Sequence, residues 1–204
     1  MNSLTEWLFS NTADTPRLPL LIGLIGLILW TAEVISLFIP WKPGKGTEKD
    51  RGSFVLIASA WTLAITFSVF DALTYRLTTL PYHLSWIQYS GIPLIIIGFG
   101  LRVPARLTLG RALTPFVQTS NPGGLITTGI YSLIRHPAYL GALGQLLGIT
   151  LCFGSVLGVA TGIFCGFPAL LYRIRVEEQA LREWFGNHYE QYATRTSRMI
   201  PRIW

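Results

Sequence analysis

The chain has 204 residues, of which 50% are hydrophobic and only 13% are charged, with a formal net charge of +6. Soluble domains usually carry about 25% charged residues, so this composition argues against an ordinary soluble domain and indicates long apolar segments. The basic residues are dispersed along the chain, which argues against nucleic-acid binding. Cys152 and Cys165 lack the spacing of a metal or redox motif, so no metal site is predicted.

Three apolar segments in the first half of the chain are long enough to cross a membrane. A spanning helix needs about 20 mostly apolar residues, and residues 18–40, 54–75 and 86–103 meet this requirement. Glu33 interrupts the first segment, and Asp71 lies near the end of the second. Charged groups inside a membrane usually have a function or a partner. For Glu33 a functional role, a helix cap and an arginine partner all stay open, whereas Asp71 is interpreted as structural.

The fourth apolar segment, residues 139–172, contains no charged residue and is too long for one span. Gly154 and Ser155 lie within it and can turn the chain, so we expect a helical hairpin and about five transmembrane helices in an all-α membrane protein. With the N-terminus outside, all of the 16 Lys and Arg residues except Arg17 and Arg76 fall on the inner side. This distribution follows the positive-inside rule and predicts a site on the cytoplasmic side.

Two segments between and after the spans differ from the rest. Residues 42–52 form a polar connector, whereas residues 106–136 are too long and irregular for a simple loop, which favours a functional role. After Tyr172, apolar residues recur at helical spacing, which predicts an amphipathic C-terminal helix on the inner side. We therefore divide the chain into an N-terminal three-helix transmembrane region, residues 1–106, and a C-terminal region, residues 107–204, that holds the candidate site.

An Arg-His-Pro-x-Tyr motif at residues 135–139 stands directly before the hairpin. Pro137 suits the first turn of a helix, whose N–H groups attract an anionic group such as a carboxylate. Tyr139 and the upstream Tyr131 could offer aromatic faces and hydroxyls to a nucleoside. The alternative is that these residues form only the basic, aromatic boundary that membrane proteins commonly have.

A second candidate cluster follows the last span. Arg173 and Glu177 are four residues apart and therefore share one helix face, while Glu178 is expected to point elsewhere. On an exposed surface such a pair contributes under about 1 kcal/mol. Next to a membrane, idle charges are disfavoured, which favours a functional role for this pair.

The two clusters belong to one combined pattern in the C-terminal region. Its members are Tyr131, Arg135, His136, Pro137, Tyr139, Arg173, Glu177, Glu178, Phe185, Gly186, Tyr189 and Tyr192. This pattern resembles the isoprenylcysteine carboxyl methyltransferase family, and the related phospholipid methyltransferases share part of it. The resemblance extends over residues 118–201, while the first three spans match only in kind.

The resemblance implies a membrane-embedded carboxyl O-methyltransferase that uses S-adenosyl-L-methionine, with residues 107–204 as the catalytic region. It assigns Arg173 to the orientation of the substrate's carboxylate. A carboxylate acceptor is already ionised and needs no general base, whereas an amine or thiol acceptor would need one, for which His136 is the candidate. The implied cofactor contacts include a strand-like segment, residues 124–126, and comprise Gln118, Gly124, Leu125, Ile126, Tyr131, His136, Pro137, Tyr139 and Glu177.

Three functions therefore compete. The first is a methyltransferase that acts on a lipophilic or lipidated acceptor such as an isoprenylcysteine, within a membrane whose lipids surround it. The second is a phospholipid or other small-molecule N- or S-methyltransferase with the same cofactor. The third is a non-enzymatic membrane scaffold. The presence of Arg173 favours a carboxylate acceptor over an amine, which would more naturally call for an extra carboxylate.

Overall fold

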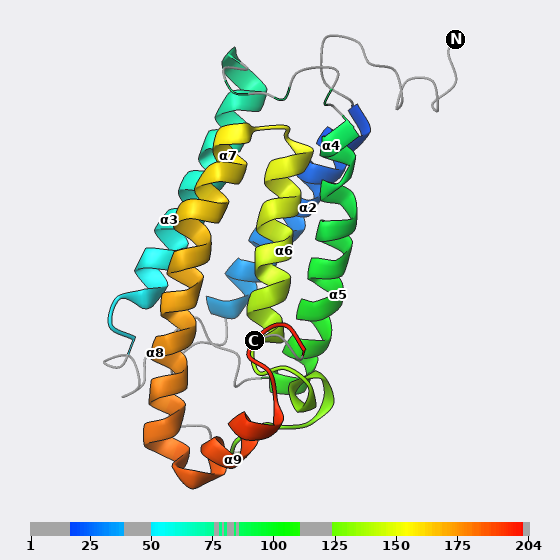
Figure 1. Ribbon diagram of the computed structural model, residues 1–204. Coiled ribbons are helices and arrows are strands. Elements are labelled where there is room, and N and C mark those ends of the chain that lie inside the picture. Colours follow the sequence, from blue (N-terminus) through cyan, green and yellow to red (C-terminus); the bar gives the residue numbers. More distant parts are fainter. Residues whose placement is uncertain are drawn as a thin grey trace.

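The computed structural model describes residues 17–38, 50–75, 78, 80, 84, 86–110 and 124–201. Its long helices run side by side as a tall bundle (Figure 1). In chain order, the described helices are α2 Arg17–Phe38, α3 Ser53–Phe70, the π-helix η2 Asp71–Tyr75, α4 Trp86–Tyr89, α5 Gly91–Leu109, the 3-10 helix η5 Gly129–Ser132, α6 Pro137–Cys152, α7 Val156–Thr161, the π-helix η6 Gly162–Gly166, α8 Phe167–Phe185 and α9 Asn187–Arg195.

The predicted helical hairpin is confirmed. α6 ends at Cys152, Gly154 turns the chain with a φ of 71°, and Ser155 caps the next helix by accepting a hydrogen bond from the Gly158 N–H at 3.1 Å. A glycine tolerates this positive φ, and a serine side chain satisfies an otherwise unpaired N–H at a helix start. The hairpin therefore returns α8 along α6 to the end of the bundle where α6 begins.

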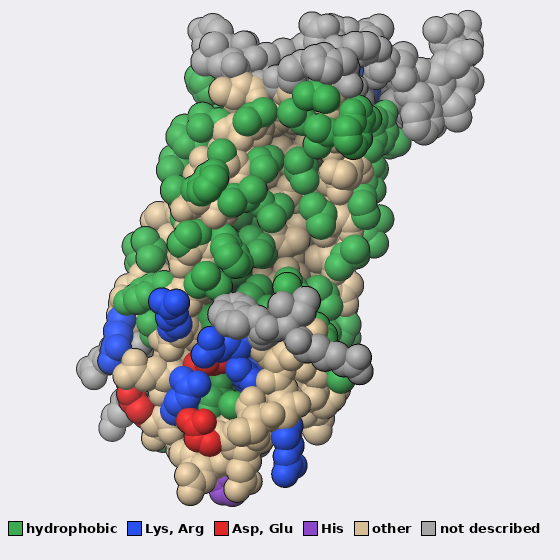
Figure 2. All heavy atoms as spheres, viewed as in Figure 1, with side chains coloured by type: hydrophobic (Ala, Val, Ile, Leu, Met, Phe, Trp, Pro, Cys, Tyr) green, Lys and Arg blue, Asp and Glu red, His purple; other side chains and the backbone are tan. Residues whose placement is uncertain are grey.

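The bundle has the apolar surface of a membrane protein. Within the described residues, four helical segments are long and apolar enough to cross a membrane, and Pro137–Cys152 is a shorter apolar helix. Figure 2 shows hydrophobic side chains over the length of one face, with charged side chains gathered at its lower end. We call this charged end, where α6 begins, the site end, and the opposite end, where the hairpin turns, the turn end.

The predicted amphipathic helix has a different boundary from the one expected. Tyr172 is not the start of a new helix, because α8 continues from the apolar part of the bundle to Phe185 without a break. Gly186, with a φ of 52°, then redirects the chain into α9. The amphipathic part is therefore the end of α8 together with α9, and it covers the site end.

The α5–α6 interface is built from glycines. A Cβ atom on Gly98 would lie 2.7 Å from the Gly141 carbonyl oxygen, and one on Gly91 would lie 2.4 Å from the Gly148 carbonyl oxygen. Both distances are far shorter than normal contacts, so the two backbones approach as closely as small residues permit. This close approach fixes α6 against α5.

Glu33 has a partner. Its carboxylate pairs with the Nε of Arg102 at 2.6 Å, and Gln145 Nε2 donates to its other oxygen at 3.4 Å. Of the three roles left open by the sequence, the structure shows the arginine partner. The pair joins α2 to α5, and the Arg102 guanidinium reaches toward the Ala138 carbonyl oxygen at 3.5 Å in the first turn of α6.

Asp71 is structural, as predicted. At the turn end its carboxylate accepts hydrogen bonds from the Thr78 backbone N–H at 3.0 Å and the Thr78 hydroxyl at 2.6 Å. The Thr78 carbonyl oxygen then accepts from the Val156 N–H at 3.0 Å. Asp71 therefore holds Thr78 in the position where Thr78 binds the first residue of α7.

Candidate active site

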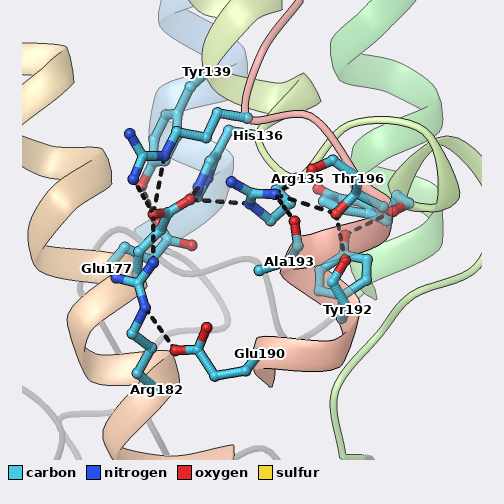
Figure 3. A network of polar contacts seen from close by, with 12 residues as sticks. Arg135, His136, Tyr139, Glu177, Arg182, Glu190, Tyr192, Ala193 and Thr196 are labelled. Carbon is cyan, nitrogen blue, oxygen red and sulfur yellow. Dashed lines mark hydrogen bonds and ion pairs between the residues drawn. The ribbon is translucent and has the colours of Figure 1, made fainter. Parts of the chain in front are cut away.

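The Arg-His-Pro-x-Tyr motif and the Arg173–Glu177 pair meet at the site end. The Tyr139 hydroxyl donates to Glu177 Oε2 at 2.6 Å, and Arg173 Nε donates to the same hydroxyl at 3.0 Å. Tyr139 lies in the first turn of α6, and the two charged residues lie one turn apart on α8. The shared helix face predicted for Arg173 and Glu177 is confirmed, because both residues contact one tyrosine. Figure 3 shows Tyr139 and Glu177 within the polar network at this end of the bundle.

His136 is buried between the two helices. Its ring stacks on Tyr139, with ring centroids 5.6 Å apart and an interplanar angle of 28°. Its Nε2 lies 3.4 Å from Glu178 Oε1. Pro137 follows as the first residue of α6, as its fixed φ favours. The start of α6 therefore presents an imidazole and a phenol as one stacked pair.

Glu178 lies at the site end in a way that sequence reasoning missed. We expected it to point away from the site, but it is 1% exposed and lies among cationic side chains. Its two oxygens pair with Arg135 Nε at 3.0 Å, Arg182 Nη2 at 3.3 Å and Arg198 at 3.1 Å, besides His136. The excess of basic residues near the motif was the available signal, but their convergence depends on where the chain returns after α9.

That return is a short C-terminal segment, residues 196–200, which we call the C-terminal strap. The Arg135 N–H donates to the Ser197 carbonyl oxygen at 2.8 Å, and the His136 N–H donates to the Arg198 carbonyl oxygen at 2.9 Å. Arg135 Nη1 also donates to the Ala193 carbonyl oxygen at 2.9 Å at the end of α9. The strap and α9 therefore hold the backbone that carries the motif.

Tyr131 is buried next to α9. It is 6% exposed, and its carbonyl oxygen accepts a hydrogen bond from the Tyr192 hydroxyl at 2.7 Å. Burial raises the pKa of the Tyr131 hydroxyl well above its usual range, and the Glu177 carboxylate acts in the same direction. The hydroxyl therefore stays protonated at neutral pH and can donate a hydrogen bond.

Arg173 contacts the N-terminal half of the chain. Its Nη1 contacts Asp50 Oδ1 and donates to the Ser53 hydroxyl oxygen at 2.8 Å. Arg173 and Asp50 are 3% and 5% exposed. The guanidinium that the resemblance assigns to a substrate's carboxylate is thus also bound to a carboxylate of the protein, in the loop that we interpreted as a simple connector.

The remaining predicted cofactor residues precede η5 in the chain. Gly124, Leu125 and Ile126 lie in a half-buried segment that belongs to neither a helix nor a strand, so the strand-like segment implied by the resemblance does not form regular strand structure here. Gly124 has a φ of 77°. Gln118 lies outside the described residues.

Comparison with known proteins first gives the broad class of protein, through a match to a family model. The sequence model of the phospholipid methyltransferase family matches residues 86–188, which include α5, the Arg-His-Pro-x-Tyr motif, the hairpin and both residues of the Arg173–Glu177 pair. The matched region thus contains the residues of the motif and the pair, whereas α2, α3 and the C-terminal strap lie outside it.

Curated relatives then give the family. Protein-S-isoprenylcysteine O-methyltransferase A of Arabidopsis thaliana is 32% identical over 97% of this chain and 98% of its own length. A probable protein-S-isoprenylcysteine O-methyltransferase of Oryza sativa subsp. indica is 32% identical over 78% of this chain and 84% of its own length. The chain belongs to the isoprenylcysteine carboxyl methyltransferase family, as the sequence pattern indicated.

A solved structure shares the fold. The eukaryotic intramembrane Ras methyltransferase ICMT (isoprenylcysteine carboxyl methyltransferase) superposes with a TM-score of 0.58 at 24% identity, over 72% of this chain and 52% of that chain. This chain therefore spans about half the length of that structure. The likeness supports the membrane-embedded helical fold.

Proposed function

We propose that this protein is a membrane-embedded S-adenosyl-L-methionine-dependent methyltransferase that esterifies the carboxylate of a lipophilic, isoprenylcysteine-like acceptor. The observation that carries the proposal is the Arg173–Tyr139–Glu177 chain of hydrogen bonds at the start of α6. The chain of hydrogen bonds places the Arg173 guanidinium, which suits the acceptor's carboxylate, next to the Glu177 carboxylate, which suits a cationic cofactor. Both lie at the end of an apolar bundle, where a lipid chain and a polar headgroup can be bound together.

The residues present fit the cofactor by their chemistry. S-Adenosyl-L-methionine carries an ammonium, a carboxylate, ribose hydroxyls and an adenine, and it supplies an electrophilic methyl group on a sulfonium. Glu177 can accept from the ammonium or a hydroxyl, and the Tyr131 hydroxyl can donate. The stacked rings of His136 and Tyr139 offer aromatic surface. Together with Pro137, Gln118 and residues 124–126, these are the proposed cofactor contacts.

The proposed mechanism relies on positioning. A free α-carboxyl group has a pKa of about 3.3–3.7, so the acceptor is ionised at neutral pH and no residue has to remove a proton. Arg173 would orient the carboxylate through the charge and hydrogen bonding of its guanidinium, and apolar helices would exclude water from the reacting pair. His136 then serves to shape the cofactor site, and its role as a base would be needed only for an amine or thiol acceptor.

The division of the chain follows from this proposal. Residues 107–204 supply the cofactor and acceptor contacts, and residues 1–106 supply the supporting helices. The positive-inside distribution of Lys and Arg supports a site on the cytoplasmic side of the membrane.

A phospholipid N-methyltransferase is the second candidate, because the family model that matches residues 86–188 is named for phospholipid methylation. Its acceptor is an amine rather than a carboxylate. Arg173, buried next to the expected methyl-transfer site, would repel a cationic headgroup, which favours the carboxylate.

One assay separates the candidates. The purified protein in detergent is incubated with methyl-labelled S-adenosyl-L-methionine and either N-acetyl-S-farnesylcysteine or phosphatidylethanolamine. A methyl ester is hydrolysed by mild base and releases labelled methanol, whereas an N-methyl group resists base. Base-labile label on the farnesylcysteine is the expected result. Base-resistant label on the phospholipid alone would replace the proposal by the second candidate, and no transfer to either, with intact cofactor binding, would reject both acceptors.

A further inference from the structure

Asp50 is held in a fixed position at the start of α3. The Ser53 N–H donates to its carbonyl oxygen at 2.9 Å, and the Phe54 N–H donates to its Oδ2 at 3.0 Å. The Ser53 hydroxyl lies 3.2 Å from Oδ1. A carboxylate at a helix start is stabilised by such an N–H group, here that of Phe54, and by the helix dipole. Asp50 is therefore part of the framework of α3.

Asp50 is also the first member of a chain of contacts that crosses the site end. Its Oδ1 contacts Arg173 Nη1, Arg173 Nε donates to the Tyr139 hydroxyl at 3.0 Å, and that hydroxyl donates to Glu177 at 2.6 Å. Three elements thus contribute to the position of one guanidinium: the start of α3, the start of α6, and α8. The position of Arg173 depends on a residue 123 positions earlier in the chain.

Two roles for Asp50 are compatible with a carboxylate on this guanidinium. As a competitor, Asp50 would occupy Arg173 until the acceptor's carboxylate displaces Asp50. As a positioning residue, Asp50 would stay in place while the acceptor binds. Displacement would disturb the hydrogen bonds that the Ser53 hydroxyl and the Phe54 N–H donate to the Asp50 carboxylate, and it would leave this buried carboxylate without its cation. We propose that Asp50 is a positioning residue that fixes the Arg173 guanidinium in the orientation that receives the acceptor's carboxylate. This inference rests on the proposed function.

The negative charge of Asp50 should also support kcat. The negative charge of the acceptor is lost as the ester forms, so a strong interaction with Arg173 stabilises the bound acceptor more than the transition state. Interactions of that kind lower the Michaelis constant without raising the rate. Asp50 shares the guanidinium and weakens this excess stabilisation. Both effects therefore predict that Asp50 supports kcat rather than acceptor affinity.

The test is Asp50→Asn, which preserves shape and an oxygen for the Phe54 N–H but removes the charge. A matched control is Asp71→Asn at the turn end. Asp71 is also 5% exposed and also accepts from one backbone N–H and one hydroxyl, but its partner is Thr78. Both variants should lower the melting temperature. Only Asp50→Asn should lower kcat, by at least tenfold, with the KM for N-acetyl-S-farnesylcysteine changed less than threefold and cofactor affinity less than twofold.

A double-mutant cycle shows whether Asp50 acts through Arg173. If it does, adding Asp50→Asn to Arg173→Ala should cause no further loss of kcat, because the group that Asp50 positions is already absent. Losses that multiply would overturn the proposal. Should Asp50→Asn fail to fold, Asp50→Glu keeps the charge but moves it, and its kcat should still fall, with normal cofactor affinity.

Other outcomes also decide the matter. A lower acceptor KM with a higher kcat in Asp50→Asn would establish the competitor role instead. An unchanged kcat in the folded Asn and Glu variants would show that Asp50 only supports the start of α3. A wild-type protein that forms no base-labile ester would overturn the proposed function and this inference together, whereas wild-type activity with unaffected Asp50 variants would overturn this inference alone.

Discussion

The two sides of α6 are held in different ways. Toward α5 the contact is made by glycines, whose backbones meet without intervening side chains. Toward α8 and the C-terminal strap the contact is made by hydrogen bonds and ion pairs, with Tyr139, His136 and Glu178 at its centre. One side therefore holds the helix mainly by close backbone packing, with the Arg102–Ala138 hydrogen bond as a polar contact, and the other side arranges charged groups at the start of the helix. The proposed chemistry lies on the second side, and it depends on the rigidity of the first.

Removal of Glu178 should disrupt the ion pairs between α8 and the start of α6, and it should cause the largest loss of folding stability. Glu178→Ala leaves Arg135, whose side chain is 9% exposed, without its carboxylate partner. Loss of one member of a buried ion pair typically costs about 3–5 kcal/mol. We expect a loss of folding stability of this order, measured by denaturant titration in detergent. The matched control is Glu183→Ala, on an exposed part of the same helix, which should change stability by less than about 0.5 kcal/mol.

A Glu178→Ala protein with wild-type stability would show that the basic residues do not need this carboxylate. Added phosphate should then leave the melting temperature of the variant unchanged, because the cluster would need no anion to replace the carboxylate.

Glu177→Ala should separate cofactor binding from folding on the same side. Glu177 is proposed to bind a cationic or hydroxyl group, and loss of a charged hydrogen-bond partner costs about 1.5–3 kcal/mol. This corresponds to a weakening of S-adenosyl-L-methionine affinity by roughly tenfold to 150-fold, which titration calorimetry can measure. Glu177→Gln should retain part of the affinity. Unchanged affinity in a folded Ala variant would remove Glu177 from the cofactor site.

The glycine contact between α5 and α6 should lose stability when a side chain is enlarged. In Gly98→Ala the new methyl group would lie 2.7 Å from the Gly141 carbonyl oxygen and 2.9 Å from the Gln145 N, both in the backbone of α6. Overpacking of this kind costs about 1–3 kcal/mol. Gly100→Ala on the same helix is the control, because nothing lies within 4 Å of its Cβ position. It should be neutral or stabilise by about 0.5–1 kcal/mol. Equal effects of the two substitutions in melting experiments would contradict a close α5–α6 contact.

The sequence predicted the shape of the molecule better than its long-range charge contacts. Apolar length and the Gly154-Ser155 turn were sufficient for the hairpin, because membrane thickness and turn chemistry are local constraints. The shared face of Arg173 and Glu177 followed from helical periodicity alone. Periodicity also suggested that Glu178 points away from the site, yet α8 has partners on a second face, where Glu178 pairs with Arg135, His136 and Arg198. Which segment covers the second face is decided by tertiary structure.

Asp50 illustrates the same limit. The polar sequence around it is typical of a flexible connector, and its role at the start of α3 depends on Arg173, far along the chain. No local pattern links the two residues. The partner of Glu33 was likewise one of several open choices until α2 and α5 were placed side by side.

The smallest effect is expected where the charged side reaches solvent. Glu190 on α9 pairs with Arg182 Nε at 3.0 Å, but the two side chains are 55% and 39% exposed. Water and salt screen such a pair, so Glu190→Ala should cost less than about 1 kcal/mol and the loss should shrink further in roughly 1 M salt. Arg182 also pairs with the buried Glu178 at 3.3 Å, and this second contact remains in the variant. Melting temperatures at low and high salt provide the measurement. A loss comparable to that of Glu178→Ala would mean that α9 is bound to α8 chiefly through Glu190, and the buried network around Glu178 would then be secondary to this surface contact.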